Sequence, residues 1–502
     1  MNKDICLHQS IPLLFGVPSA IASNFAIVSS LIIMVTSAVF YMAAEVWSEF
    51  PFFALSAALL LIHGISALLT AGANFLYVFR YMLVWILIFG TAYVWMIYPG
   101  EVFVAPFGLQ FQTPANTRIL VLAGILSLCG SLMGWHVSLR KFRYKKPKLF
   151  ILPFAKQKQL MLAGYILAFG FSMLYVWKAG GIVGGDKAYA DVEQGFALEF
   201  GVFNIFHFIG IALILLSNVT NNAIQRKYIY IAIITLIPGM MAGSRADFLP
   251  QAFIVFMLIF NNKIVDILKT KKYWYFAFYF VGALVLITLA YLISSFIAIW
   301  RSGGVDILAI VDVLLNSDKG LLINDVYGHR MLYFETGNMM LGGLYSAIVQ
   351  VREGYTGLLY GESYFNYLLI SPPAFLGLPR PLGLEWATNI SGETMTQGGI
   401  FEVAEAYWNF GLVGCFLVSF GLSYFFAWLL RRGILYNNYF FVVWYFAFGI
   451  HGFRSIWYQT FSYFRLITVM FVLFGLSYLF FRWFLRDNAE YGTRKDTQTV
   501  LR

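Results

Sequence analysis

Two glutamates in the stretch GGIFEVAEAYWNFG have a spacing that suits acid–base chemistry. Glu402 and Glu405 lie three residues apart, and on a helix this spacing places both carboxylates on one face. Two close carboxylates repel each other, which favours a proton on one of them and suits the pair to proton transfer. The alternative is that both acids are solvated residues at the start of a helix, where acidic side chains are favoured.

Arginine and histidine recur where apolar runs are interrupted. Arg245 lies within MMAGSRADFLP, Arg380 lies between the prolines of SPPAFLGLPRP, and His451 and Arg454 lie within HGFRS. Arginine keeps its charge and binds phosphate oxygens through two parallel hydrogen bonds. Such a set can hold a diphosphate and stabilise the charge that grows as it leaves, while a Glu or His takes a proton from an attacking hydroxyl.

These residues also have structural interpretations. Arg245 can extend to lipid headgroups, with Ser244 as the cap of the following helix. Arg380 can pair with an acid of its own loop, and Arg454 can anchor a helix end at the membrane surface. His451 is more often a hydrogen-bonded structural residue than a base.

Three further residues are candidates for substrate binding. His329 and Arg330 lie in YGHRMLYFETGN, and Tyr407 follows the two glutamates. Packing within the loop explains His329 and Arg330 equally well. The sequence has no P-loop, no G-x-S-x-G elbow, no H-E-x-x-H motif and no clustered acids spaced for a divalent metal. We therefore expect no cofactor and no metal.

The composition indicates which elements position these residues. Of the 502 residues 60% are hydrophobic and only 12% are charged, which is typical of an integral membrane protein. About twelve apolar runs are long enough to span a bilayer. They cover residues 21–43, 52–71, 81–98, 118–138, 159–177, 199–218, 228–243, 247–262, 274–297, 407–430, 436–452 and 465–483.

Lys and Arg in the connecting loops predict the orientation. The basic loops at 140–148, 225–227, 269–272 and 431–432 and the tail fall on one side, which is the cytoplasm, and we assign Lys3 and Arg80 to it as well. The net charge of +10 is explained by this topology and by anionic lipid headgroups, so no nucleic-acid partner is expected. Both termini are expected in the cytoplasm.

One long excursion lies on the opposite side and reverses the charge balance, with eleven acids against five bases. Helical spacing over 307–315 and 331–351 predicts short helices packed on the membrane domain, and the prolines of 371–381 predict a rigid turn. The predicted organisation is a membrane domain of nine spans (1–298), an extracytoplasmic loop subdomain (299–406), three further spans (407–485) and a cytoplasmic tail (486–502).

In order and in topology, the segments GSRAD, ISPPAFLGLPRP, GGIFEVAEAYWNFGLVG and HGFRSIWYQTFSYFRLITVMF resemble the Wzy-type oligosaccharide repeat-unit polymerases. The resemblance covers roughly residues 238–484. It implies an all-α polytopic membrane protein with a GT-C-like fold in the bacterial plasma membrane. It also implies that periplasmic arginines are needed, and these correspond to Arg245, Arg380 and Arg454.

The activity implied by this resemblance is glycosyl transfer at the outer face of the membrane. A growing glycan moves from undecaprenyl diphosphate onto the non-reducing end of a new lipid-linked repeat unit. The implied partners are the undecaprenyl-diphosphate-linked donor and acceptor, membrane lipids, a chain-length regulator and a flippase. Two alternatives remain open: an O-antigen ligase that transfers glycan to a lipid A core, and a transporter of lipid-linked sugars, which shares the number of spans.

Overall fold

The computed structural model describes long helices over part of the chain. The described residues are 20–43, 54–61, 63–64, 75–90, 114–140, 154–178, 200–217, 219–220, 223–224, 230–231, 233–237, 335–354, 356–375, 401–436, 438–458, 463–464 and 466–471. Four of the candidate residues, Arg245, His329, Arg330 and Arg380, lie outside these residues. The spans predicted at 247–262 and 274–297 lie outside them as well.

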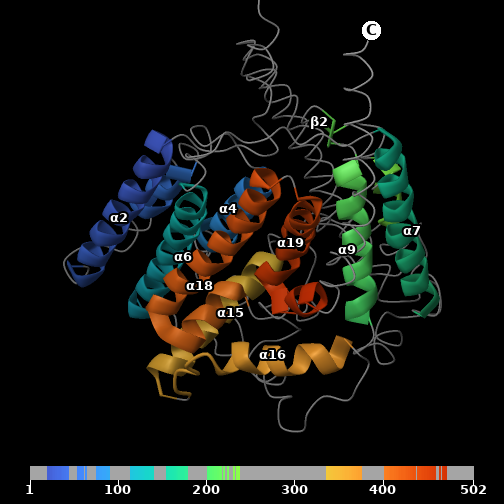
Figure 1. The fold of residues 1–502 in the computed structure, drawn as a ribbon. Coiled ribbons are helices and arrows are strands. Elements are labelled where there is room, and N and C mark those ends of the chain that lie inside the picture. The colour runs from blue at the N-terminus through green and yellow to red at the C-terminus, as the bar shows by residue number, and fades with distance from the viewer. Residues whose placement is uncertain are drawn as a thin grey trace, which may run out of the picture.

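The described part of the chain is helical apart from one pair of two-residue strands (Figure 1). The strands β1 (Val219–Thr220) and β2 (Ala223–Ile224) pair antiparallel. The helices are α2 (Ala20–Ala43), α4 (Phe75–Trp85), the π-helical turn η1 (Ile86–Gly90), α6 (Pro114–Arg140), α7 (Phe154–Lys178), α9 (Phe200–Ser217), α15 (Glu335–Arg352), α16 (Glu362–Phe375), α18 (Glu402–Leu435) and α19 (Tyr439–Tyr458).

Within the described ranges, three helices are long and apolar enough to cross a membrane, namely Ser23–Met42, Arg118–Arg140 and Glu402–Gly433. Helix α2 has no acidic or basic residue in its sequence, and it exposes large apolar side chains such as Ile32 and Val35. An apolar helix with an exposed apolar surface is what a lipid-facing span requires. The described residues thus form a helical protein with membrane-spanning candidates, and the predicted spans 21–43, 118–138 and 407–430 coincide with these helices.

Small residues bring α6 and α18 into close contact. A Cβ atom on Gly134 would lie 2.2 Å from the carbonyl oxygen of Phe420, so only glycine fits there. Ser131 and Ser423 share a hydrogen bond of 2.7 Å across the same contact. Close backbone approach at small residues, supplemented by interhelical hydrogen bonds, is how helices associate in membranes, where lipid removes the usual hydrophobic drive.

The same kind of contact joins α7 and α9. A Cβ atom on Gly164 would lie 2.7 Å from the carbonyl oxygen of Gly210, so the two backbones nearly touch. One helical turn away, the ring N–H at Nδ1 of His207 donates to the carbonyl oxygen of Ala168 at 2.7 Å. Figure 1 shows α7 and α9 side by side, on the other side of α19 from α2 and α6.

Helix α18 is broken near its start and folds back on itself. Phe410 and Gly411 leave helical geometry, and Gly411 has φ 63° and ψ −151°. Cys415 Sγ lies 3.7 Å from the carbonyl oxygen of Val403, although residues twelve apart in a straight helix are separated by about 18 Å. We call residues 402–409 the short segment and residues 412–435 the long segment.

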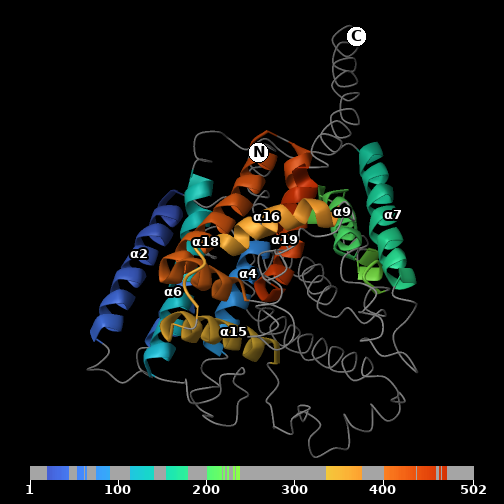
Figure 2. The same ribbon diagram turned by 90° about the horizontal axis from the view of Figure 1, so that it is seen from below.

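Two helices from the predicted loop subdomain pack on this bundle. Helix α15 contacts α18 and α6, and α16 runs across one end of the membrane helices (Figures 1 and 2). The helix predicted over 331–351 is therefore confirmed. The break predicted from Ser371 is wrong in its first part, because α16 continues through Pro372 and Pro373 to Phe375. A proline removes one backbone hydrogen bond, and the last turn of this helix forms without it.

Candidate functional site

An ion pair joins the start of α18 to α4. Arg80 Nη2 donates to Glu402 Oε1, and the two side chains are only 10% and 4% exposed. The other carboxylate oxygen of Glu402, Oε2, is buried and has no hydrogen-bond partner among the described residues. A charge in such surroundings is costly unless it is paired, and Arg80 supplies the opposite charge next to Glu402.

The position of Arg80 corrects the predicted topology. We assigned Arg80 to a cytoplasmic loop and Glu402 to the opposite rim, but a direct ion pair cannot join opposite membrane surfaces. Arg80 lies inside α4 and is buried. Glu402 is brought inward because the break after the short segment folds that segment back along the long one.

Glu405 has a separate set of partners, contributed by α16. Ser363 Oγ donates to Glu405 Oε1 at 3.0 Å, and the hydroxyl of Tyr367 forms a second side-chain hydrogen bond to Glu405. Asn409 Nδ2 lies 2.8 Å from both Ser363 Oγ and the carbonyl oxygen of Glu405. Glu405 is only 1% exposed, so these donors replace water around its carboxylate.

Backbone contacts hold α16 against the short segment. The amides of Leu359 and Tyr360 donate to the carbonyl oxygens of Trp408 and Asn409, at 3.1 and 2.9 Å. The amide of Gly361 donates to Asn409 Oδ1 at 3.1 Å. These bonds satisfy the carbonyl groups left free where the short segment ends, and they fix the register in which Ser363 meets Glu405.

Two tyrosines of α16 face the glutamates. Burial raises the pKa of Tyr364 well above its usual range, and the nearby charges of Glu405 and Glu402 raise it further. Burial and Glu405 raise the pKa of Tyr367 in the same direction. Both hydroxyls therefore stay protonated at neutral pH and can donate hydrogen bonds. The ring of Tyr364 stacks on those of Phe410 and Phe464, with centroids 6.2 and 6.1 Å apart.

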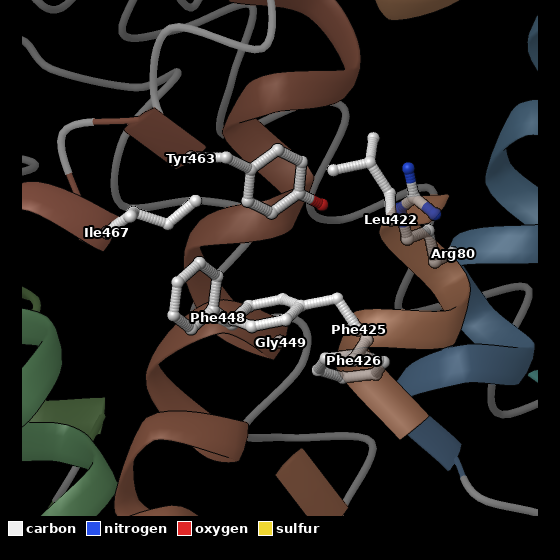
Figure 3. A pocket seen from close by; sticks show the side chains of 8 residues that line it. All are labelled: Arg80, Leu422, Phe425, Phe426, Phe448, Gly449, Tyr463 and Ile467. Carbon is white, nitrogen blue, oxygen red and sulfur yellow. The ribbon is translucent and has the colours of Figure 1, made fainter. Parts of the chain in front are cut away.

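Arg80 also lines an apolar pocket between α4, the long segment and α19 (Figure 3). Its lining includes Phe425, Phe448 and Tyr463, and Figure 3 shows the Tyr463 hydroxyl directed towards Leu422 and Arg80. Four of the eight lining residues are aromatic and one is Arg80, so the pocket suits an apolar group next to a positive charge. No cluster of three His, Cys, Asp or Glu side chains placed to hold a metal occurs within the described ranges.

The structure brings together only part of the predicted site. The helical spacing of Glu402 and Glu405 is confirmed, and both lie in the short segment with Tyr407, which is also buried. The interpretation of the two glutamates as solvated helix-start residues is wrong, because neither is exposed. His451 and Arg454 lie within α19, which continues to Tyr458, so the turn predicted after residue 452 is wrong.

Sequence reasoning missed four contributors to this cluster, namely Arg80, Ser363, Tyr367 and Asn409. Arg80 carried a usable signal, because it is the one charge in the apolar helix FLYVFRYMLVW, and a charge in such a helix is usually functional. Asn409 lies one helical turn after Glu405, which is a weaker signal. Ser363 and Tyr367 carried none, since nothing in the sequence links α16 to the glutamates.

Comparison with known proteins gives no relative for this chain. No protein-family model, no curated protein and no solved structure matches it. The geometry of the buried cluster and the order of the sequence motifs are therefore the basis for assigning a function.

Proposed function

We propose that this protein polymerises lipid-linked oligosaccharide repeat units in the bacterial plasma membrane. The growing glycan is transferred from undecaprenyl diphosphate to the non-reducing end of a new repeat unit at the outer face. Three features support the proposal: the helical membrane-type architecture, the order of the four polymerase-like motifs, and a buried cluster of one arginine and two glutamates.

The reaction needs one bond to form and one to break. The oxygen of an acceptor hydroxyl attacks the anomeric carbon of the donor glycan, and the bond from that carbon to the diphosphate oxygen breaks. Undecaprenyl diphosphate leaves with the bonding electrons, and the proton of the acceptor hydroxyl passes to a base. In the proposal, Arg245 and Arg380 bind the diphosphate and Arg454 supports the charge on the leaving group.

Glu402 is the proposed base, and its free carboxylate oxygen is the observation that carries the proposal. Oε1 of Glu402 is bound by Arg80, which orients the carboxylate, while Oε2 has no partner among the described residues. Glu405 by contrast is bound by Ser363 and Tyr367, so its role is to position the short segment. A base must have an oxygen available to the proton that it removes, and Glu402 fits this requirement.

The proposal includes a topology of about twelve spans with a GT-C-like arrangement and both termini in the cytoplasm. The basic loops support this orientation, with Arg80 now assigned to the interior of a span. Single cysteines placed in the loops at 140–148 and 382–392, each in a chain without its native cysteines, test it in intact cells. Labelling by a membrane-impermeant maleimide at 382–392 and protection at 140–148 are expected, and the reverse pattern would reject the orientation.

The activity is tested with the full-length protein in proteoliposomes, supplied with lipid-linked repeat units from cells that lack it. A ladder of products spaced by one repeat unit is expected. Glu402→Gln should lower the rate at least about a hundredfold, as loss of a general base does. Arg245→Ala should also abolish the ladder, and Arg245→Lys should restore little of it because lysine lacks the bidentate geometry. A parent chain that makes no ladder would reject the polymerase.

A transporter remains the second candidate function. The observation that favours it is the burial of the Arg80–Glu402 pair inside the helical domain, since transporters carry ionisable residues at such depth. Movement of lipid-linked repeat units across the proteoliposome membrane without new glycosidic bonds would support this function. A ligase is separated by a cell experiment: without the protein, long lipid-linked chains should disappear for a polymerase and accumulate for a ligase.

A further inference from the structure

Helix α16 exposes apolar side chains and buries polar ones. Four buried positions recur at helical spacing, and three of them carry a polar group: Ser363, Asn366, Tyr367 and Ile370. The exposed positions begin with Glu362 at the helix start and continue with Phe365, Leu368 and Leu369, which are 60%, 49% and 43% exposed. A helix on the surface of a soluble protein shows the reverse pattern, with its apolar stripe directed inward.

The direction of α16 relates this exposed face to the membrane. Figures 1 and 2 both show α16 lying crosswise at one end of the helix bundle, whereas α6 and α18 run along the bundle. Both α6 and α18 contain a segment long and apolar enough to cross a membrane. A helix crosswise to such spans at their end lies along the membrane surface, where a helix with one apolar face is stable.

The start of α16 adjoins an apolar stripe on the outside of α18. Val413 and Leu417 are four residues apart on one face of the long segment, and they are 64% and 54% exposed. In a spanning helix such residues face lipid. Phe410 lies at the top of this stripe, where its ring stacks on that of Tyr364 and a Cβ atom on Gly361 would lie 2.9 Å from its Cζ. Lipid along α18 therefore reaches the beginning of α16.

We propose that α16 is an interfacial helix whose outer face, formed by Phe365, Leu368 and Leu369, inserts into the bilayer surface. Helices of this kind bury their apolar face about 5–10 Å into the boundary between headgroups and acyl chains. The inference does not depend on the polymerase, since a transporter could carry the same helix. Because Ser363 on the inner face of α16 donates to Glu405, the bilayer surface then holds the short segment through α16.

The depth of the outer face is measured with an environment-sensitive fluorophore on single cysteines. Phe365→Cys and Leu368→Cys are made in the full-length chain without its native cysteines, labelled with a nitrobenzoxadiazole reagent and reconstituted in phosphatidylcholine–phosphatidylglycerol vesicles. Quenching is compared for iodide on both sides of the membrane, a nitroxide on the lipid headgroup and a nitroxide deep in the acyl chain. We expect the headgroup nitroxide to remove most of the emission and iodide to remove little.

Two matched control positions calibrate the depth. Glu353→Cys places the label on an exposed residue directly after α15, and iodide should quench it most. Leu417→Cys places the label seven residues beyond Phe410, about 10 Å along a helix, and the deep nitroxide should quench it most. Phe365 and Leu368 are both exposed, so neither substitution should lower the Tm, and each position tests the proposal independently of the other.

The order of the quenchers decides the proposal. Stronger quenching by the headgroup nitroxide than by iodide or the deep nitroxide, at both positions, supports the interfacial helix. Quenching by iodide as strong as at Glu353 would show that the outer face lies in water, as a docking surface for a soluble partner would, and would overturn it. Weak quenching by all three agents would show a face covered by protein, and strongest quenching by the deep nitroxide would place α16 inside the hydrocarbon; either result overturns it as well.

Discussion

The contact between α6 and the long segment of α18 differs from the cluster around the short segment in how its polar groups are satisfied. In the first, Ser131 and Ser423 bind each other at 2.7 Å, and the backbones approach closely at Gly134. In the second, a charged pair and a second glutamate are buried, and the atoms Glu402 Oε2 and Tyr364 Oη lack partners among the described residues.

The difference separates packing from function within one helix. The Ser131–Ser423 pair satisfies both of its hydroxyls across the helix contact, so changes to this pair should alter stability. A cluster that keeps polar atoms unpaired is less stable than it could be, which is the usual cost of a binding or catalytic site. Changes in the cluster should therefore affect activity more than stability, and four predictions test this.

The largest effect is expected at the Arg80–Glu402 pair. Arg80→Ala leaves the Glu402 carboxylate buried without its cation, and it should lower the free energy of unfolding by about 3–5 kcal/mol. The double variant Arg80→Met, Glu402→Leu should regain most of that stability, because apolar residues of similar volume replace the pair. Thermal unfolding in detergent measures both, and the ladder assay should show neither variant to be active.

The matched control for this prediction is Arg352→Ala. Arg352 is an exposed arginine whose Nη1 donates to Asn116 Oδ1 at 2.7 Å. The variant Arg352→Ala should lower the free energy of unfolding by no more than about 1 kcal/mol, as is typical for exposed polar contacts. Equal losses for Arg80→Ala and Arg352→Ala would contradict the idea that burial makes the first pair special.

A smaller effect is expected when Glu405 loses one donor. Ser363→Ala removes the hydroxyl that donates to Glu405 Oε1 and accepts from Asn409. It should lower the free energy of unfolding by about 1.5–3 kcal/mol. Because Ser363 supports the short segment, the rate of polymerisation should fall as well, while Ser363→Thr keeps the hydroxyl and should recover part of it. A rate equal to that of the parent in Ser363→Ala would show that α16 does not position the site.

The packing contact should respond in stability alone. Gly134→Ala places a Cβ atom 2.2 Å from the carbonyl oxygen of Phe420 and should cost about 1–3 kcal/mol by forcing α6 and α18 apart. Gly170→Ala in α7 is the matched control, because its Cβ would meet nothing within 4 Å and alanine favours helix. The rate in the ladder assay should be unchanged in both, and a lower rate in Gly134→Ala would show that this packing contact also affects the candidate site.

The smallest effect is expected from one of the serine pairs. Ser131→Ala removes the 2.7 Å hydrogen bond to Ser423 and should cost about 0.6 kcal/mol, the average for such bonds between membrane helices. The measurement is thermal unfolding, with the ladder assay unaffected. If Ser131→Ala lowered the free energy of unfolding more than Ser363→Ala does, the expected order of the two effects would be wrong.

Much of the helical layout follows from the sequence. The predicted spans at 21–43, 118–138, 159–177 and 199–218 coincide with α2, α6, α7 and α9, because an apolar run of such length can satisfy its backbone in lipid only as a helix. The break in α18 was not predicted. Glycine is common in membrane helices, and Gly411 differs from the others only because the chain folds back there.

The sequence by itself determined that the chain is a helical membrane-type protein, and that Glu402 and Glu405 share one helical stretch. Only the tertiary structure decided their partners, because Arg80 is 322 residues from Glu402 and Ser363 is 42 residues from Glu405. Hydropathy and helical spacing depend on residues that are close in the sequence. The partner of a buried charge depends on which side chains the tertiary packing places next to it. For that reason a basic residue assigned to a loop by its position in the chain lies at the centre of the candidate site.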